Sequence, residues 1–149
     1  MKVKAIMTEK VLKVRMDDSI GTIRNILEHV EFHHLLVVKG RELVGILSDR
    51  DVFRVISPFL GTLSEESRDM TLLTRKIHQI MTRNPITVDK DTSIEDAANL
   101  LLNKNISCLP VVSPKRQIKG IVTWKDILGF YTKGNTTSDQ KHGNRPQTR

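Results

Sequence analysis

The sequence predicts an α+β fold in which two β-α-β-β-α repeats, related by a pseudo-twofold axis, pack through their sheets. Two observations predict this fold. Residues 45–51 and 120–126 follow one pattern, in which a glycine and two apolar residues precede a hydroxyl residue, and an aspartate stands three positions after the hydroxyl residue. The tripeptide Ile-Met-Thr occurs at residues 6–8 and again at residues 80–82. Self-similarity at a fixed spacing is typical of a repeat architecture.

The two copies align over most of the chain. The offset between them is 74 residues in the first part of each repeat, and 75 after one extra residue in the turn at residues 113–116. Neither half, with about fifty residues, is expected to be stable alone. We therefore expect one body in which equivalent segments of the two halves face a shared cleft. The predicted boundaries are repeat 1 at residues 1–58, a linker at residues 59–79, repeat 2 at residues 80–132 and a disordered tail at residues 133–149.

Each repeat begins with a strand and a helix. Residues 11–14 and 85–88 are short and apolar enough for edge strands, and Pro85 stands at a strand start, where proline is tolerated. Side-chain oxygens then precede an apolar stripe with helical spacing, so residues 17–19 and 91–93 are expected to hold the helix N-caps. The predicted helices cover residues 20–30 and 94–101.

Two strands and a second helix complete each repeat. In both halves a turn that contains glycine or proline joins two apolar runs, which indicates a hairpin. The hydroxyl residue of the repeated segment closes the second strand and opens the helix after it. Packing one three-stranded sheet against the other would bury both apolar faces. The predicted strands are residues 35–38, 43–47, 109–112 and 118–122, and the predicted helices are residues 49–56 and 124–131.

The linker and the tail do not share the repeat pattern. Residues 65–76 are charged and have room for a short helix packed on the outside, whereas residues 134–149 have no aliphatic or aromatic side chain, which predicts disorder. The formal charge of the chain is +7, and residues 133–149 contribute +3 of it. Aromatic residues make up only 4% of the chain, too few to suggest a platform for stacking bases, so nucleic acid is not the expected partner.

Composition also bears on location and on metal binding. The longest aliphatic run, residues 35–38, is far shorter than the ~20 residues that span a bilayer, so no membrane association is expected. No secretory signal is visible, and the cytoplasm is the expected compartment. The single Cys108 lies in a predicted buried strand and cannot form an internal disulfide. His29, His33 and His34 have no further ligands at a recognisable spacing, so no metal site is predicted.

The duplicated pattern resembles the CBS domain, which is named for cystathionine β-synthase and normally occurs in tandem as a Bateman module. The resemblance covers residues 4–131. It rests on the two Gly-apolar-apolar-Ser/Thr-x-x-Asp segments, on the Ile-Met-Thr that opens each copy, and on the Leu-Pro-Val-Val at residues 109–112. The first copy departs from the family pattern because Leu36 stands where the family often has proline. The chain therefore resembles a stand-alone protein made of one CBS domain pair.

This resemblance implies a regulatory module that binds an adenosine-containing ligand in one or two clefts between the repeats. The expected ligands are AMP, ADP, ATP or S-adenosylmethionine, with no catalytic cofactor. A homodimer and a protein effector are the expected partners. An enzyme is not expected, because the sequence shows no catalytic triad, Gly-rich phosphate loop or metal motif. Two alternatives stay open: a scaffold or dimerisation module with empty clefts, and a nucleic-acid-binding protein that uses its basic tail.

The resemblance also assigns site residues. Asp51 and Asp126 are expected to accept hydrogen bonds from ribose hydroxyls, and Asp126 is expected to matter more because the second copy matches the family better. Ser48 and Thr123 are expected to bind a phosphate or ribose oxygen at a helix N-terminus, where backbone N–H groups and the helix dipole favour an anion. His33 is an expected phosphate contact, from a resemblance to the γ subunit of AMP-activated protein kinase. The remaining predicted contacts are Arg50 and Lys125 as countercharges for phosphates, and Val11, Leu12, Pro85, Ile86, Leu109 and Pro110 as walls for adenine.

Each Ser/Thr-x-x-Asp segment also fits a simpler interpretation. A hydroxyl residue followed three positions later by an acid is close to a capping box, which starts a helix without binding anything. Capping and binding are compatible. Two copies, each directly after a glycine-containing apolar strand, favour ligand binding in at least one cleft.

Overall fold

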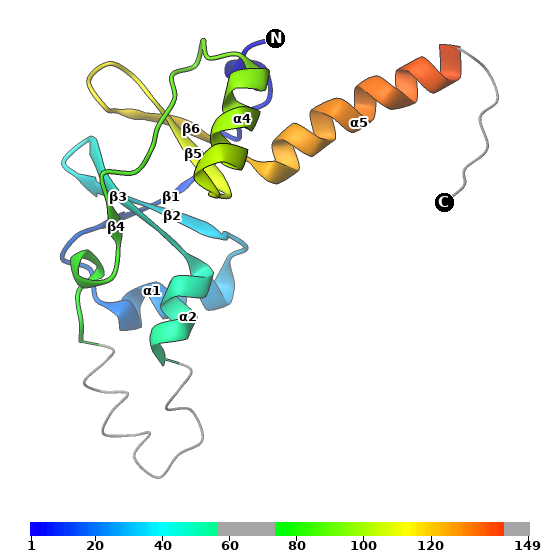
Figure 1. Ribbon diagram of the computed structural model, residues 1–149. Coiled ribbons are helices and arrows are strands. Elements are labelled where there is room, and N and C mark those ends of the chain that lie inside the picture. The colour runs from blue at the N-terminus through cyan, green and yellow to red at the C-terminus, as the bar shows by residue number, and fades with distance from the viewer. Residues whose placement is uncertain (57–73, 142–149) are drawn as a thin grey trace.

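The structure of the protein is a computed structural model that describes residues 1–56 and 74–141, the last eight of these by their backbone only (Figure 1). Most of the predicted linker, including the larger part of its predicted helix, lies outside the described residues. The same holds for the end of the predicted tail, residues 142–149.

The first half of the chain forms the predicted strand–helix–strand–strand–helix unit after one short 3-10 turn. The second predicted helix of this unit has the predicted bounds. Ser19 is the N-cap of the first helix, because its Oγ accepts a hydrogen bond of 3.2 Å from the backbone N–H of Thr22. The elements are η1 (Val3–Ala5), β1 (Leu12–Arg15), α1 (Ile20–His29), β2 (His34–Lys39), β3 (Glu42–Ser48) and α2 (Asp49–Ile56).

The second half follows the same order with two differences. Only Val88 of the predicted strand at residues 85–88 pairs, in a parallel bridge with Val111. The final helix continues to Lys141, into residues 133–149, the predicted disordered tail. No proline interrupts this stretch, and its backbone N–H groups continue the helical ladder. The elements are η3 (Ile77–Gln79), β4 (Thr82–Arg83), α4 (Ile94–Lys104), β5 (Cys108–Val112), β6 (Ile118–Thr123) and α5 (Trp124–Lys141).

The repeats exchange their first segments. The exchanged segment of the first repeat is residues 3–8, which pack on the second repeat, and that of the second is residues 77–83, which pack on the first. In the first sheet, of order β1-β2-β3-β4, strand β4 comes from the second repeat and pairs antiparallel with β3. In the second sheet, Thr8 from the first repeat forms an antiparallel bridge with Ile121 of β6. The predicted three-stranded sheets are therefore not built from one repeat each. Strand β4 stands 36–38 positions from its partners on β3, Gly45 with Arg83 and Ile46 with Thr82, and Thr8 stands 113 positions from Ile121.

The glycine of the repeated segment permits this exchange. A Cβ atom added at Gly120 would lie 2.7 Å from the carbonyl oxygen of Thr8, and one added at Gly45 would lie 2.5 Å from the sulfur of Met81. The Thr8 carbonyl belongs to the backbone, so a side chain at position 120 would push the exchanged segment away from β6. At Gly45 the nearest atom belongs to a flexible side chain, and the Thr82 carbonyl lies 3.1 Å from an added Cβ.

Three apolar clusters hold the fold together. Two lie between a sheet and its helices, and each includes residues of the exchanged segment: Ile77 and Met81 pack into the core of the first repeat, and Val3 packs into the core of the second. The third cluster lies between the two sheets. It contains Leu36 of the first sheet and Val112 of the second, on the sheet faces that are turned away from the helices. The predicted packing of the repeats through their sheets is therefore confirmed, and the two repeats form one packed body.

Candidate functional site

The repeated segment forms the same corner in both halves. The backbone N–H of Ser48 donates to Asp51 Oδ2 over 2.9 Å, and the backbone N–H of Asp51 donates to Ser48 Oγ over 3.1 Å. In the second half the backbone N–H of Thr123 donates to Asp126 Oδ2 over 2.9 Å, and that of Asp126 donates to Thr123 Oγ1 over 3.3 Å. Both segments are reciprocal capping boxes at the starts of α2 and α5, so the capping interpretation is confirmed.

A cavity of about 720 Å³ lies between the repeats at the start of α2; we call it the first cleft. Ser48, Arg50 and Asp51 line it from the first repeat, and Pro85 and Ile86 line it from the second. These five predicted site residues therefore surround one space. Its volume is within the range of roughly 300–1,000 Å³ that is typical of small-molecule sites.

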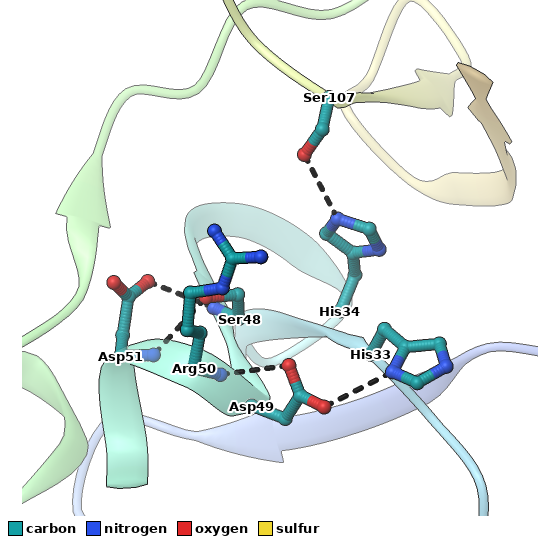
Figure 2. A network of polar contacts seen from close by, with 7 residues as sticks. All are labelled: His33, His34, Ser48, Asp49, Arg50, Asp51 and Ser107. Carbon is teal, nitrogen blue, oxygen red and sulfur yellow. Dashed lines mark hydrogen bonds and ion pairs between the residues drawn. The ribbon is translucent and has the colours of Figure 1, made fainter. Parts of the chain in front are cut away.

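The Asp51 carboxylate is open to this cleft. Its side chain is 38% exposed, and Oδ1 lies 3.9 Å from Nη1 of Arg54, whose side chain is 71% exposed. An ion pair this exposed is weak and is easily exchanged for another partner. Figure 2 shows the Asp51 carboxylate and the Arg50 guanidinium pointing to the same side of α2, away from the helix. The arrangement offers hydrogen-bond acceptors and a cation beside an apolar wall.

The equivalent region of the second half holds two cavities. Thr123, Lys125 and His33 line a cavity of about 810 Å³, which we call the second cleft. Asp126 and Lys125 line an adjoining cavity of about 870 Å³. Thr8 lines both, and its hydroxyl donates to Asp126 Oδ1 over 3.2 Å. The sequence reasoning missed Thr8, although it closes the repeated Ile-Met-Thr.

Four residues predicted as adenine walls lie elsewhere. Leu109 is 0% exposed and belongs to the core of the second repeat, and Pro110 beside it is buried. Val11 packs in the cluster between the sheets, and Leu12 packs against the core of the first repeat. None of the four lines the cavities described above. Their apolar character reflects the sheet faces that they cover.

The two adjacent histidines have different environments (Figure 2). His33 is largely exposed, and its Nδ1 lies 3.0 Å from Asp49 Oδ2. His34 Nε2 lies 3.2 Å from the Ser107 hydroxyl, a contact that joins the first repeat to the second. Burial lowers the pKa of His34, and the charge of Asp49 partly opposes this shift. His34, Ser107 and Trp124 line both the first and the second cleft, so they form the wall between them.

Cys108 also lines the first cleft and is buried, as the sequence predicted. Burial, with a smaller contribution from Asp126, raises the pKa of its thiol to about 12. Among the described residues, no three histidine, cysteine or acidic side chains lie together as a metal site would require. None of the helices within the described ranges is long and apolar enough to cross a membrane.

Comparison with known proteins adds to this geometry. The family model described as "CBS domain" matches residues 3–58 and 77–133. A CBS domain-containing protein of Dictyostelium discoideum is 32% identical over 133 residues, which cover 88% of this chain and 91% of that protein. Several other curated relatives bear the names of enzymes, and the chain spans only 22–23% of their length.

Solved structures share the fold. The CBS domain pair of protein MJ0100, in complex with 5′-methylthioadenosine and S-adenosyl-L-methionine, superposes with a TM-score of 0.71 and 28% identity, covering 90% of this chain and 98% of that one. The protein CBSX2 in complex with AMP superposes with a TM-score of 0.74 over 90% of this chain and 98% of that chain. At 24% identity this second likeness shows the fold alone.

Proposed function

The chain belongs to the CBS domain family, and from that premise we propose that it is a regulatory module that binds an adenosine-containing ligand between its two repeats. The ligand class comprises AMP, ADP, ATP and S-adenosylmethionine. In this proposal the module is cytoplasmic, performs no catalysis, and signals to a partner protein.

The observation that carries this proposal is the composition of the first cleft. Asp51 supplies carboxylate oxygens of the kind that accept hydrogen bonds from both hydroxyls of a ribose. Arg50 supplies a cation for a phosphate or a carboxylate, and Pro85 and Ile86 supply an apolar surface for a base. The solved CBS domain pair with 28% identity holds S-adenosyl-L-methionine and 5′-methylthioadenosine, which supports this ligand class.

Regulation follows in this proposal from the position of the clefts. Their walls come from both repeats, so a ligand that contacts both walls has a different affinity for different arrangements of the repeats. Such a ligand shifts the population toward the arrangement that it binds better. The contact between His34 and Ser107 lies on the wall between the clefts. It joins the two repeats directly, so a ligand in either cleft can change their relative position through it.

A thermal-shift experiment tests the proposal. AMP, ADP, ATP, S-adenosylmethionine and 5′-methylthioadenosine are each added to the wild type and to Asp51→Ala and Asp126→Ala. A ligand at 100 times its dissociation constant should stabilise the wild type by about 2.7 kcal/mol. The stabilisation should fall in at least one of the two variants. Asp17→Ala removes an exposed carboxylate outside the cavities described above and should respond like the wild type. Equal stabilisation of all four proteins would contradict the ribose role.

The thermal-shift experiment and a deletion of the tail separate the two alternative functions. A scaffold with empty clefts would show no rise in melting temperature with any of the five ligands. A nucleic-acid-binding protein that uses its basic tail would lose binding to DNA or RNA when residues 134–149 are deleted, with its response to adenylates unchanged.

We include a homodimer in the proposal. Phe53 on α2 and Leu128 on α5 stand at equivalent positions of the repeats and are 40% and 59% exposed. Two large apolar side chains at symmetric positions suit a twofold contact with a second copy. Light scattering should give twice the chain mass, and Leu128→Glu should halve it. Leu102→Glu, at an exposed leucine of α4, is the matched control and should stay dimeric. A monomeric wild type would contradict the dimer.

A further inference from the structure

The two aspartates differ in how many hydrogen bonds they can still accept. A carboxylate offers about four acceptor positions. Asp126 already receives three donors: the backbone N–H of Thr123 at 2.9 Å, the hydroxyl of Thr123 at 3.2 Å and the hydroxyl of Thr8 at 3.2 Å. The Thr8 hydroxyl also lies 3.5 Å from the second oxygen. About one acceptor position is left, whereas the two hydroxyls of a ribose need two.

Asp51 is less occupied. Within the part of the chain that the structure describes, one hydrogen bond to its carboxylate is present, from the backbone N–H of Ser48 at 2.9 Å. The 3.9 Å ion pair with Arg54 is exposed and too long for a hydrogen bond. Thr82, the counterpart of Thr8, lines the first cleft, and the described residues show no hydrogen bond from its hydroxyl to Asp51. With this one donor among the described residues, Asp51 keeps about three acceptor positions, which is enough for both ribose hydroxyls.

The backbone holds Thr8 in place. The N–H of Thr8 donates to the carbonyl of Ile121 over 2.8 Å, and the N–H of Ile121 donates back over 2.9 Å. Gly120 makes this approach feasible, because any Cβ there would collide with the Thr8 carbonyl. The Thr8 hydroxyl is thus presented to Asp126 by the exchange of segments itself. A ribose at Asp126 would have to displace this hydroxyl, whereas no side-chain hydroxyl of residues 1–56 or 74–133 donates to Asp51.

We propose that Thr8 makes the two halves inequivalent: it occupies the carboxylate of Asp126, so that the first cleft, at Asp51, is the principal adenosine site of this chain. This inference rests on the proposed function and assigns it to one site. It reverses the order expected from the sequence, in which Asp126 mattered more. Thr8 acts as an internal competitor, since its hydroxyl satisfies the group that a ribose would use.

Calorimetric titration of the full-length chain with AMP and with S-adenosylmethionine tests this inference. The wild type should bind with one principal site, which Asp51→Asn abolishes and Asp126→Asn leaves in place. Thr8→Val removes the hydroxyl while keeping a β-branched side chain of similar size. It should strengthen binding at Asp126 by about ten- to hundredfold, the worth of one hydrogen bond to a charged group. Asp126→Asn in the Thr8→Val background should remove this gain.

Thr8→Ser is the matched control, because it keeps the hydroxyl and should behave like the wild type. The comparison of Asp51→Asn with Asp126→Asn tests the same inference in a chain with Thr8 intact, so the result does not depend on the folding of Thr8→Val. Principal binding at Asp126, equal contributions of both aspartates, or weaker binding at Asp126 in Thr8→Val would overturn the inference and leave the proposed function standing. If neither AMP nor S-adenosylmethionine binds the wild type or Thr8→Val, both the inference and the proposed function would be overturned.

Discussion

At the scale of single residues, His34 is the side chain on which the two clefts meet. Its ring lies against Ser107 of the second repeat, and its titratable neighbours are Asp49, Asp51 and the adjacent His33. Burial lowers its pKa from 6.5, which means that the fold favours the neutral ring. At neutral pH His34 therefore joins the repeats as an uncharged hydrogen-bonding partner.

This lowered pKa predicts an acid-sensitive stability. The unfolded chain takes up a proton at His34 near pH 6.5, whereas the folded chain does so at a lower pH. The unfolded state therefore binds more protons in this window, and the free energy of unfolding should fall as the pH drops below 6.5. Urea unfolding between pH 5 and 8 measures the slope. His34→Gln should make it shallower, and His29→Gln, at the end of α1, should not. An unchanged slope in His34→Gln would contradict this assignment.

Cys108 gives a second prediction at this scale. With its pKa raised to about 12, the buried thiol stays protonated and unreactive in the folded protein even though it lines the first cleft. Alkylation by iodoacetamide at pH 8, followed by mass spectrometry, should leave Cys108 unmodified until urea unfolds the chain. Lys115→Cys places a second thiol in an exposed turn and should react at once. Rapid modification of Cys108 in the folded protein would show that the cleft opens to it.

At the scale of elements, the glycines of β3 and β6 decide how the sheets are completed. Each stands where the exchanged segment of the other repeat lies against the strand. A Cβ added at Gly45 would lie 2.5 Å from the Met81 sulfur, and one added at Gly120 would lie 2.7 Å from the Thr8 carbonyl oxygen. The two contacts differ in kind. At Gly45 the nearest atom belongs to a flexible methionine side chain, whereas at Gly120 it belongs to the backbone.

Gly120→Ala should therefore destabilise the protein by about 1–3 kcal/mol, because the backbone of Thr8 has to move away from β6. Chemical denaturation measures this loss. Gly129→Ala is the matched control. That glycine lies in α5 with no atom within 4 Å of an added Cβ, so the change should stabilise the protein by up to about 1 kcal/mol through helix propensity. Equal effects of the two substitutions would contradict the close approach at Gly120.

At the scale of the whole molecule, the exchange of segments makes the two repeats interdependent. Val3 is 0% exposed in the core of the second repeat, although it belongs to the first. Ile77 is equally buried in the core of the first repeat. Neither core is complete without residues of the other half, so we expect the chain to unfold in a single transition.

Val3→Ala tests this interdependence. It should cost about 2 kcal/mol through lost burial and an incompletely filled site, and hydrogen exchange should speed up in α4 and β5, far from residue 3 in the sequence. Val30→Ala, where the valine is 39% exposed, is the control and should change stability by less than about 0.5 kcal/mol. Two separate unfolding transitions, one for each repeat, would refute the single cooperative body.

The sequence by itself determined most of the elements and the corners at which they meet, but not β4, and the strand predicted at residues 85–88 is reduced to one bridge at Val88. The α2 helix has the predicted bounds, the N-caps fall in the predicted triplets, and both Ser/Thr-x-x-Asp segments form reciprocal caps. These features depend on residues within four positions of each other, where apolar periodicity and hydrogen bonding by short side chains act directly. The duplication was visible in the sequence for the same reason, since each copy contains the same local residue patterns.

The tertiary structure alone decided which segments of the two repeats lie against each other. Thr8 and Asp126 are 118 positions apart, and no local pattern indicates that the exchange of segments brings them together. Leu109 and Pro110 look like a pocket wall in the sequence, yet they are buried because both faces of β5 are covered. The pairing of β4 with β3 and of Thr8 with β6 joins residues of different repeats, so it depends on packing between the halves and not on a local pattern. Local chemistry therefore set the two aspartate corners, and the exchange of segments made them unequal.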